Sequence, residues 1–117
     1  MAEPTPVQKI SCKNSAAFVM FFQVHYKNPG SATSDHLDWS SGNYPVGKTK
    51  TCDLSKFDDV LKEGAAVWIR VDAIAGKNKN SNKDSFVYKD NGHTAKYEVK
   101  GMTRDYSINV IPQGLER

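Results

Sequence analysis

Apolar and polar residues alternate most clearly over residues 65–73. The apolar positions of this segment are Val67, Ile69, Val71 and Ala73, and the positions between them hold Trp68, Arg70 and Asp72. Because successive side chains of a strand point to opposite faces, the pattern predicts a half-buried β-strand. Its second face combines a large aromatic ring, a cation and a carboxylate, as is common where a sheet contacts a ligand.

A similar alternation, bounded by turn-forming residues, recurs along the chain. The further segments expected to be strands are residues 7–12, 17–27, 35–41, 48–54, 85–89, 94–100 and 105–111. About eight short strands with frequent turns predict an all-β, single-domain antiparallel β-sandwich with at most one short helix. Residues 1–6 are expected to be an extended lead-in, and residues 7–117 the sandwich domain.

Two local patterns refine this expectation. Asn91 and Gly92 favour a type I′ turn, so residues 85–89 and 94–100 are predicted to form a hairpin. Helical spacing occurs in residues 55–62, which predicts about two turns with Ser55 as the N-cap and Gly64 just past the end.

The two cysteines, Cys12 and Cys52, allow two interpretations. They either form one disulfide between an N-terminal and a middle strand, or remain buried thiols that behave as small apolar residues. Neither belongs to a CxxC or HxxxH spacing, so no zinc site is expected from them.

The net charge of +3 is low for a protein dedicated to binding duplex DNA, so no nucleic-acid partner is expected. The lysines of residues 77–83 could attract phosphates, sulfated glycans or anionic lipid, but a solvated polar loop is the more usual explanation of such a cluster. The N-terminal residues contain no signal-peptide pattern. A cytoplasmic or non-classically released protein is therefore expected, unless Met1 begins a mature secreted chain.

Residues 38–44 are the strongest candidate for ligand binding. Trp39 and Tyr44 could stack on the C–H bonds of a sugar ring, while Asp38 and Asn43 could bond its hydroxyls. The alternative is that Trp39 covers the open edge of the core, and a covering element would likewise make Trp68 a core residue. The full candidate set is Asp38, Trp39, Asn43, Tyr44, Trp68, Arg70 and Asp72.

Catalytic signatures are absent from the sequence. His25, His36 and His93 stand apart from any known catalytic pattern, so a hydrolase would need them to converge in space. His36 and Asp38 could share a face, but two ligands are too few for a metal site. We therefore expect a non-enzymatic protein without a cofactor.

Three segments, residues 17–22, 43–54 and 97–108, resemble small β-sandwich proteins of fungi and actinobacteria. This group includes carbohydrate-binding lectins and lipid-binding, cytolysin-like proteins, and the resemblance implies a similar fold and class here. It transfers no binding residue position by position.

The sequence thus favours a lectin-like protein that recognises a glycan or glycoconjugate through loop aromatics. The alternative is a membrane-binding, cytolysin-like or defence protein whose partner is anionic lipid. A homodimer is compatible with either hypothesis, because an uncovered face around Trp68 could form the contact.

Overall fold

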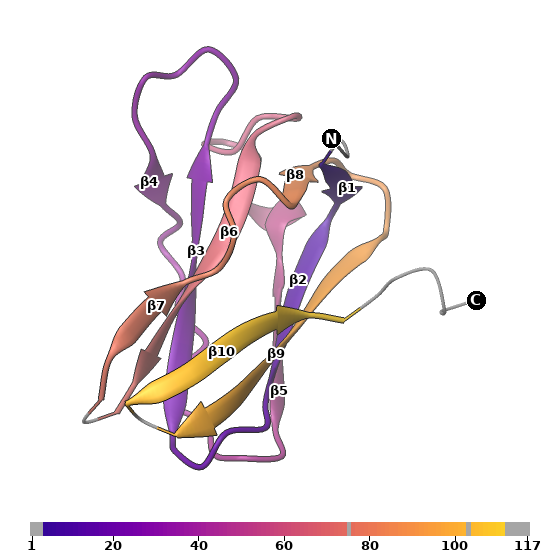
Figure 1. The fold of residues 1–117 in the computed structure, drawn as a ribbon. Coiled ribbons are helices and arrows are strands. Elements are labelled where there is room, and N and C mark those ends of the chain that lie inside the picture. Colours follow the sequence, from indigo (N-terminus) through magenta and orange to yellow (C-terminus); the bar gives the residue numbers. More distant parts are fainter. Residues whose placement is uncertain (1–3, 75, 103, 112–117) are drawn as a thin grey trace.

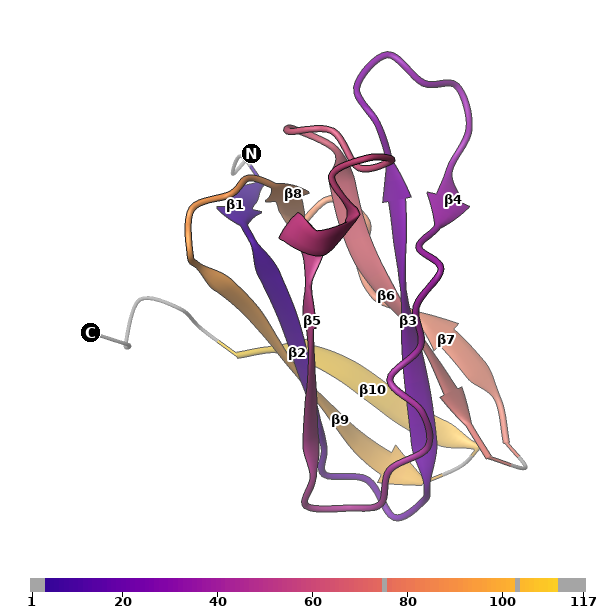
Figure 2. The same ribbon diagram turned by 180° about the vertical axis from the view of Figure 1, so that it is seen from behind.

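A computed structural model describes residues 4–74, 76–102 and 104–111. They form two β-sheets that face each other across one hydrophobic core (Figure 1, and from behind in Figure 2). The first sheet has the strand order β1-β8-β6-β3-β4, with β7 also paired to β6, and the second has the order β10-β9-β2-β5. The prediction of an all-β sandwich is confirmed.

The strands of the first sheet are β1 (Thr5–Val7), β3 (Met20–Lys27), β4 (Asp35–His36), β6 (Ala66–Ala73), β7 (Asn78–Asn80) and β8 (Phe86–Tyr88). Those of the second are β2 (Lys9–Asn14), β5 (Thr49–Asp53), β9 (Thr94–Met102) and β10 (Asp105–Val110). Thr5 and Pro6, expected in the lead-in, thus begin the first strand. Of the strand expected over residues 35–41, only Asp35–His36 has regular strand geometry.

The pairing of β3 with β6 is the longest in the first sheet. It is antiparallel and continuous from Met20 opposite Ala73 to Lys27 opposite Ala66. Alternate residues of both strands point into the core, and Val67, Ile69 and Val71 are fully buried there, as predicted. The core also receives alternate side chains of the second sheet, namely Ile10, Cys12, Cys52, Ala95, Tyr97 and Val99.

Two strand pairs are parallel, so the sheets are mixed and not purely antiparallel. The chain passes from β1 in the first sheet to β2 in the second, and from β8 to β9 in the same way. Because these two crossovers run in the same direction, β1 pairs with β8 in parallel and β2 pairs with β9 in parallel.

The hairpin expected around residues 91–92 is therefore wrong, since β8 and β9 belong to different sheets. The polar turn between them is attached to the bend at Gln8 instead. Gly92 donates its backbone N–H to the Gln8 side-chain oxygen at 2.8 Å, and Asn91 donates its side-chain N–H to the Pro6 carbonyl at 3.1 Å. The turn residues predicted where the chain turns, but not the partner of β8, which pairs with β6 and β1 and not with β9.

The expected helix is shorter than predicted and begins earlier. It is one 3-10 turn, η1 (Leu54–Phe57), capped by Asp53, whose carboxylate accepts a hydrogen bond from the Ser55 backbone N–H at 3.1 Å. Ser55 is thus inside the helix and not its cap. Among the described residues, no helix has the length and apolar character needed to cross a lipid bilayer.

Cys12 and Cys52 are free, buried thiols, so the disulfide interpretation is wrong. Although β2 and β5 are neighbours, Cys12 lies opposite Lys50 and Cys52 lies opposite Ile10. Such diagonal positions have Cα atoms roughly 7–8 Å apart, beyond the usual disulfide range. Burial raises the pKa of each thiol to about 12, so both stay protonated and unreactive at neutral pH.

Candidate ligand-binding surfaces

The predicted glycan loop, residues 38–44, runs along the outer edge of β3. Backbone N–H groups of Ser41 and Tyr44 donate to the carbonyls of Phe22 and Met20, at 3.0 and 2.8 Å. The Ser41 hydroxyl also accepts from the Phe22 N–H at 2.9 Å. The segment therefore closes the edge of the first sheet as an irregular strand, which protects that edge from other chains.

Both aromatic rings of this loop point into the molecule. Tyr44 is 2% exposed, and its hydroxyl donates to the Cys12 carbonyl at 2.9 Å, so the ring has no face available for a sugar. Trp39 packs edge-on against Phe22, with ring centroids 5.2 Å apart, and is half-buried against the core. The stacking role predicted for Tyr44 is thus corrected to a packing role, while Asp38 and Asn43 remain exposed.

Trp68 lies on the opposite, outward face of the first sheet. It is 3% exposed, although it does not belong to the core between the sheets. His25 stacks on its ring at a centroid distance of 6.0 Å, and the Lys83 ammonium sits 5.2 Å from its centroid. Since Trp39 packs on the inward-facing Phe22, the sheet separates the two tryptophans and they do not share one cleft.

Arg70 and Asp72 lie further along the same face of β6 and form an ion pair with N and O 3.5 Å apart. Their side chains are 38% and 21% exposed, respectively. A half-exposed pair of this kind contributes only about 0–1 kcal/mol to stability. Neither residue lines the pocket beside Trp68, so the predicted candidates divide over three separate places.

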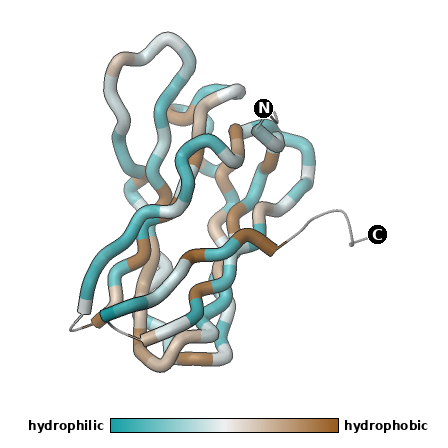
Figure 3. Tube along the Cα trace, in the orientation of Figure 1, coloured by the Kyte–Doolittle hydropathy of each residue, from teal (hydrophilic) through white to brown (hydrophobic). Residues whose placement is uncertain are grey.

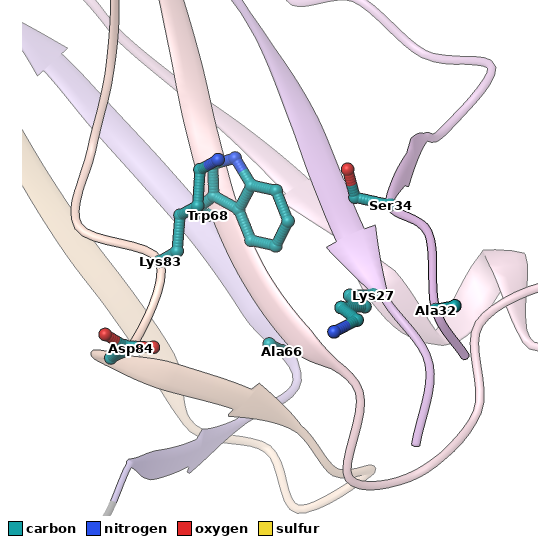
Figure 4. A pocket seen from close by; sticks show the side chains of 7 residues that line it. All are labelled: Lys27, Ala32, Ser34, Ala66, Trp68, Lys83 and Asp84. Carbon is teal, nitrogen blue, oxygen red and sulfur yellow. The ribbon is translucent and has the colours of Figure 1, made fainter. Parts of the chain in front are cut away.

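A pocket of about 400 Å³ opens beside Trp68. Figure 4 shows the Lys83 side chain against the indole and the Lys27 ammonium on the other side of the pocket. Its lining residues come from the end of β3, the following loop, β6 and the segment before β8: Lys27, Ala32, Ser34, Ala66, Trp68, Lys83 and Asp84.

The charges around His25 oppose its protonation. The pKa of this imidazole is lowered, first by burial and then by the neighbouring His36, Arg70 and Lys83. The rings of His25 and His36 are 5.7 Å apart, and within the described ranges no histidine ring bonds a hydroxyl, thiol or carboxylate. Nor does that part of the chain group three or more metal-ligating side chains.

A second surface, here called the apolar end, lies where β3 and β5 begin and β6 and β9 end. It exposes Val19, Val46, Ile74 and Met102, and Figure 3 shows the corresponding brown and tan turns along the lower end. The Ile74 N–H donates to the Val19 carbonyl at 2.9 Å, which holds two of its turns together.

Cations border the apolar end. A smaller pocket, of about 120 Å³, is lined there by Lys77, Asn78, Lys79, Arg104, Asp105 and Tyr106. Lys79 donates from its ammonium to the Tyr106 carbonyl at 2.7 Å, while Lys77 and Arg104 are exposed. Three cations against one carboxylate make this corner electropositive.

Sequence reasoning found the lysines of residues 77–83 but missed the apolar end. One feature of the sequence could have indicated it: Val46 lies between Pro45 and Gly47 in a turn, where polar residues are usual. The convergence of four distant turns at one end could not be read from the pattern of any single strand.

Comparisons with known proteins give a distant likeness of fold. No model of a known protein family and no curated protein matches the chain. The membrane-binding domain of pneumolysin is 11% identical with a TM-score of 0.45, covering 90% of this chain and 96% of that domain. A non-hemolytic pneumolysin from Streptococcus pneumoniae strain ST306 is 10% identical (TM-score 0.45, 90% of this chain), and listeriolysin O is 11% identical (TM-score 0.43, 89%).

The chain spans only 23% and 22% of the length of those two toxins. The likeness to cytolysin membrane-binding domains is a distant one of fold, and the expected lectin and cytolysin-like functions both stay predictions. At such low identity the function has to be inferred from this chain's own residues.

Proposed function

We propose that this protein is a non-enzymatic, membrane-binding protein that contacts anionic lipid surfaces through its apolar end. The observation that carries the proposal is the convergence of Val19, Val46, Ile74 and Met102 at one end of the sandwich, beside Lys77 and Arg104.

The apolar side chains supply one part of the binding free energy. Met102 is 67% exposed and Ile74 is 41% exposed, so water surrounds much of both. Fully burying such a side chain is worth roughly 1.5–3 kcal/mol, and partial insertion of four of them therefore gives a substantial gain. Exposed apolar side chains gathered at one place mark an interaction site more often than scattered ones do.

The cations supply the other part. A Lys or Arg near an anionic leaflet contributes about 1 kcal/mol, so Lys77, Lys79 and Arg104 together add roughly 3 kcal/mol at low salt. Their small pocket suits the phosphate of a lipid headgroup, since ammonium and guanidinium groups are good phosphate donors. Apolar side chains at the tip with cations at the rim match the depth profile of a bilayer interface.

Vesicle co-sedimentation tests the proposal. We expect binding to vesicles that contain phosphatidylserine, weaker binding to pure phosphatidylcholine, and a decrease with rising salt. Replacing both Ile74 and Met102 by Ser should reduce binding by at least tenfold. The matched control is Val60→Ser, because Val60 is 42% exposed and lies beyond η1, away from the apolar end.

A second pair of variants separates local from overall charge. Lys77→Gln with Arg104→Gln should weaken binding several-fold, whereas Lys56→Gln with Lys62→Gln removes the same charge elsewhere and should do so far less. The proposal would be overturned if the two pairs lost binding equally, or if the double Ser variant of Ile74 and Met102 bound vesicles like the wild type. Inhibition of vesicle binding by free sugars would instead support a lectin.

A further inference from the structure

We infer that the pocket beside Trp68 is a separate binding site for an acidic sugar residue, a hydroxyl-rich ring with a single carboxylate. The inference rests on the pocket's charges, size and walls, and it does not depend on the membrane proposal.

The charges of the pocket call for an anion. Lys27 and Lys83 provide two ammonium groups and Asp84 one carboxylate, and none of the three forms an ion pair with another described residue. The Lys83 ammonium lies 5.2 Å from the centroid of the Trp68 ring, so this lysine borders the pocket before a ligand arrives. The pocket therefore carries a net positive charge that the other described residues leave without an ion pair.

The same groups favour a monoanion with hydroxyls over a phosphate. Asp84 would repel a second negative charge, but it can accept a hydrogen bond from a sugar hydroxyl. The Ser34 hydroxyl can donate or accept in the same way. A sugar with one carboxylate satisfies both lysines without leaving Asp84 opposed by a dianion.

The size and walls of the pocket suit one sugar ring. Its volume of about 400 Å³ is at the lower end of the range for small-molecule sites. The methyl groups of Ala32 and Ala66 leave room for the ring. Because His25 and Lys83 cover the indole and Trp68 is only 3% exposed, Trp68 serves as one wall of the pocket, and the ligand does not stack across its face.

This pocket and the apolar end are well separated. Trp68 and Ile74 are six residues apart along an extended strand, which corresponds to roughly 20 Å. The loop that contributes Ala32 and Ser34 extends beyond the opposite end of the sandwich (Figure 2). A protein bound to a membrane by its apolar end would thus present this pocket to a soluble glycan.

Indole N–H signals of the full-length, ¹⁵N-labelled protein test the inference by NMR. The sequence has two tryptophans, and a Trp39→Phe variant identifies the signal of Trp68. Titration with N-acetylneuraminic acid or glucuronic acid should shift the Trp68 signal and leave that of Trp39 in place. Glucose and inorganic phosphate are the neutral and purely anionic comparisons, and both should bind at least fivefold more weakly.

Variants of the pocket give the second readout. Lys27→Gln should weaken binding of the acidic sugar at least fivefold, whereas Lys50→Gln, which changes another exposed lysine, on β5, should not. Lys27→Gln should also leave sedimentation unchanged with vesicles that carry an acidic glycolipid.

Four outcomes would overturn the inference. If phosphate binds as tightly as the acidic sugars, the pocket is a general anion site. If glucose binds as tightly, the charge of the ligand does not contribute to recognition. If Lys27→Gln no longer binds vesicles that carry an acidic glycolipid, the pocket binds the membrane glycolipid and not a soluble glycan. Failure of every sugar, with vesicle binding intact, would refute this site and leave the membrane proposal standing.

Discussion

The two faces of β6 show how one strand serves two environments. Val67, Ile69 and Val71 point inward and are completely enclosed by the second sheet. Trp68 points outward and is almost as fully buried, but its neighbours are His25 and Lys83, and it borders a pocket instead of a second sheet. Burial alone therefore does not distinguish a core residue from one that borders a binding site; the neighbours of the side chain do.

The largest expected effect is on the inner face. Ile69→Ala removes three carbons from a site with no exposure and should lower the free energy of unfolding by about 4 kcal/mol, within the range for such substitutions. Urea denaturation with a common slope measures this loss. Val60→Ala, at an exposed position, should stay within about 0.5 kcal/mol, and a similar cost for both would show that the inner face is not the core.

The outer face should be less sensitive to truncation of a larger side chain. Trp68→Ala is expected to cost about 3 kcal/mol, near the bottom of the range for buried aromatics, because a pocket and a flexible lysine already form part of its surroundings. The same denaturation experiment measures it. A cost well above that of Ile69→Ala would mean that Trp68 is a core residue in the ordinary sense.

The outer face should also respond to pH in the window below 6.5, the ordinary pKa of an imidazole. The pKa of His25 is lowered in the folded state, so below its ordinary value of 6.5 the unfolded chain binds the extra proton more readily. Stability should therefore fall as the pH drops through this window. His25→Gln should flatten the slope in denaturation curves recorded at several pH values, and an unchanged slope would exclude His25 as its source.

At lower pH, the dependence of stability on pH should come mainly from carboxylates. The pKa of Asp53 is held down chiefly by a hydrogen bond from Ser55, and that of Glu98 chiefly by one from Ser15. Both contribute stability above their ordinary pKa values that is lost as the pH falls through the folded-state values. This second loss should persist in His25→Gln, which separates it from the first.

The smallest expected effect belongs to the Arg70–Asp72 pair. Because the Arg70 side chain is 38% exposed, a double-mutant cycle of Arg70→Met and Asp72→Asn should give a coupling of about 0.2–1 kcal/mol. The coupling should shrink in high salt. A larger, salt-independent value would mean that the pair is enclosed in solution.

Much of the fold was predictable because it depends on local alternation. The inward positions of β6 and β9 follow directly from their period of two, and so does the edge position of β5 with its solvent-facing Lys50. The final strand shows the limit of that rule. Tyr106 and Ile108 of β10 contact the core as expected, but Val110, at the last position of this edge strand, is 43% exposed.

The candidate site was less predictable, because exposure depends on partners that are distant in the sequence. The composition of residues 38–44 suits a sugar-binding loop, yet hydrogen bonds to β3 turn Tyr44 inward. Conversely, no local pattern joins Lys27, Ser34 and Asp84, which come from three separate segments of the chain.

The sequence by itself determined the all-β class, the buried face of each long strand and the positions of the main turns, because these depend on neighbouring residues and on the geometry of an extended chain. Only the tertiary structure decided which strands pair in parallel, that Cys12 and Cys52 stay apart, and which aromatics are enclosed. It also gathered Val19, Val46, Ile74 and Met102 at one end. The physical reason is that strand order and register bring distant segments together, and no local pattern encodes which segments those are.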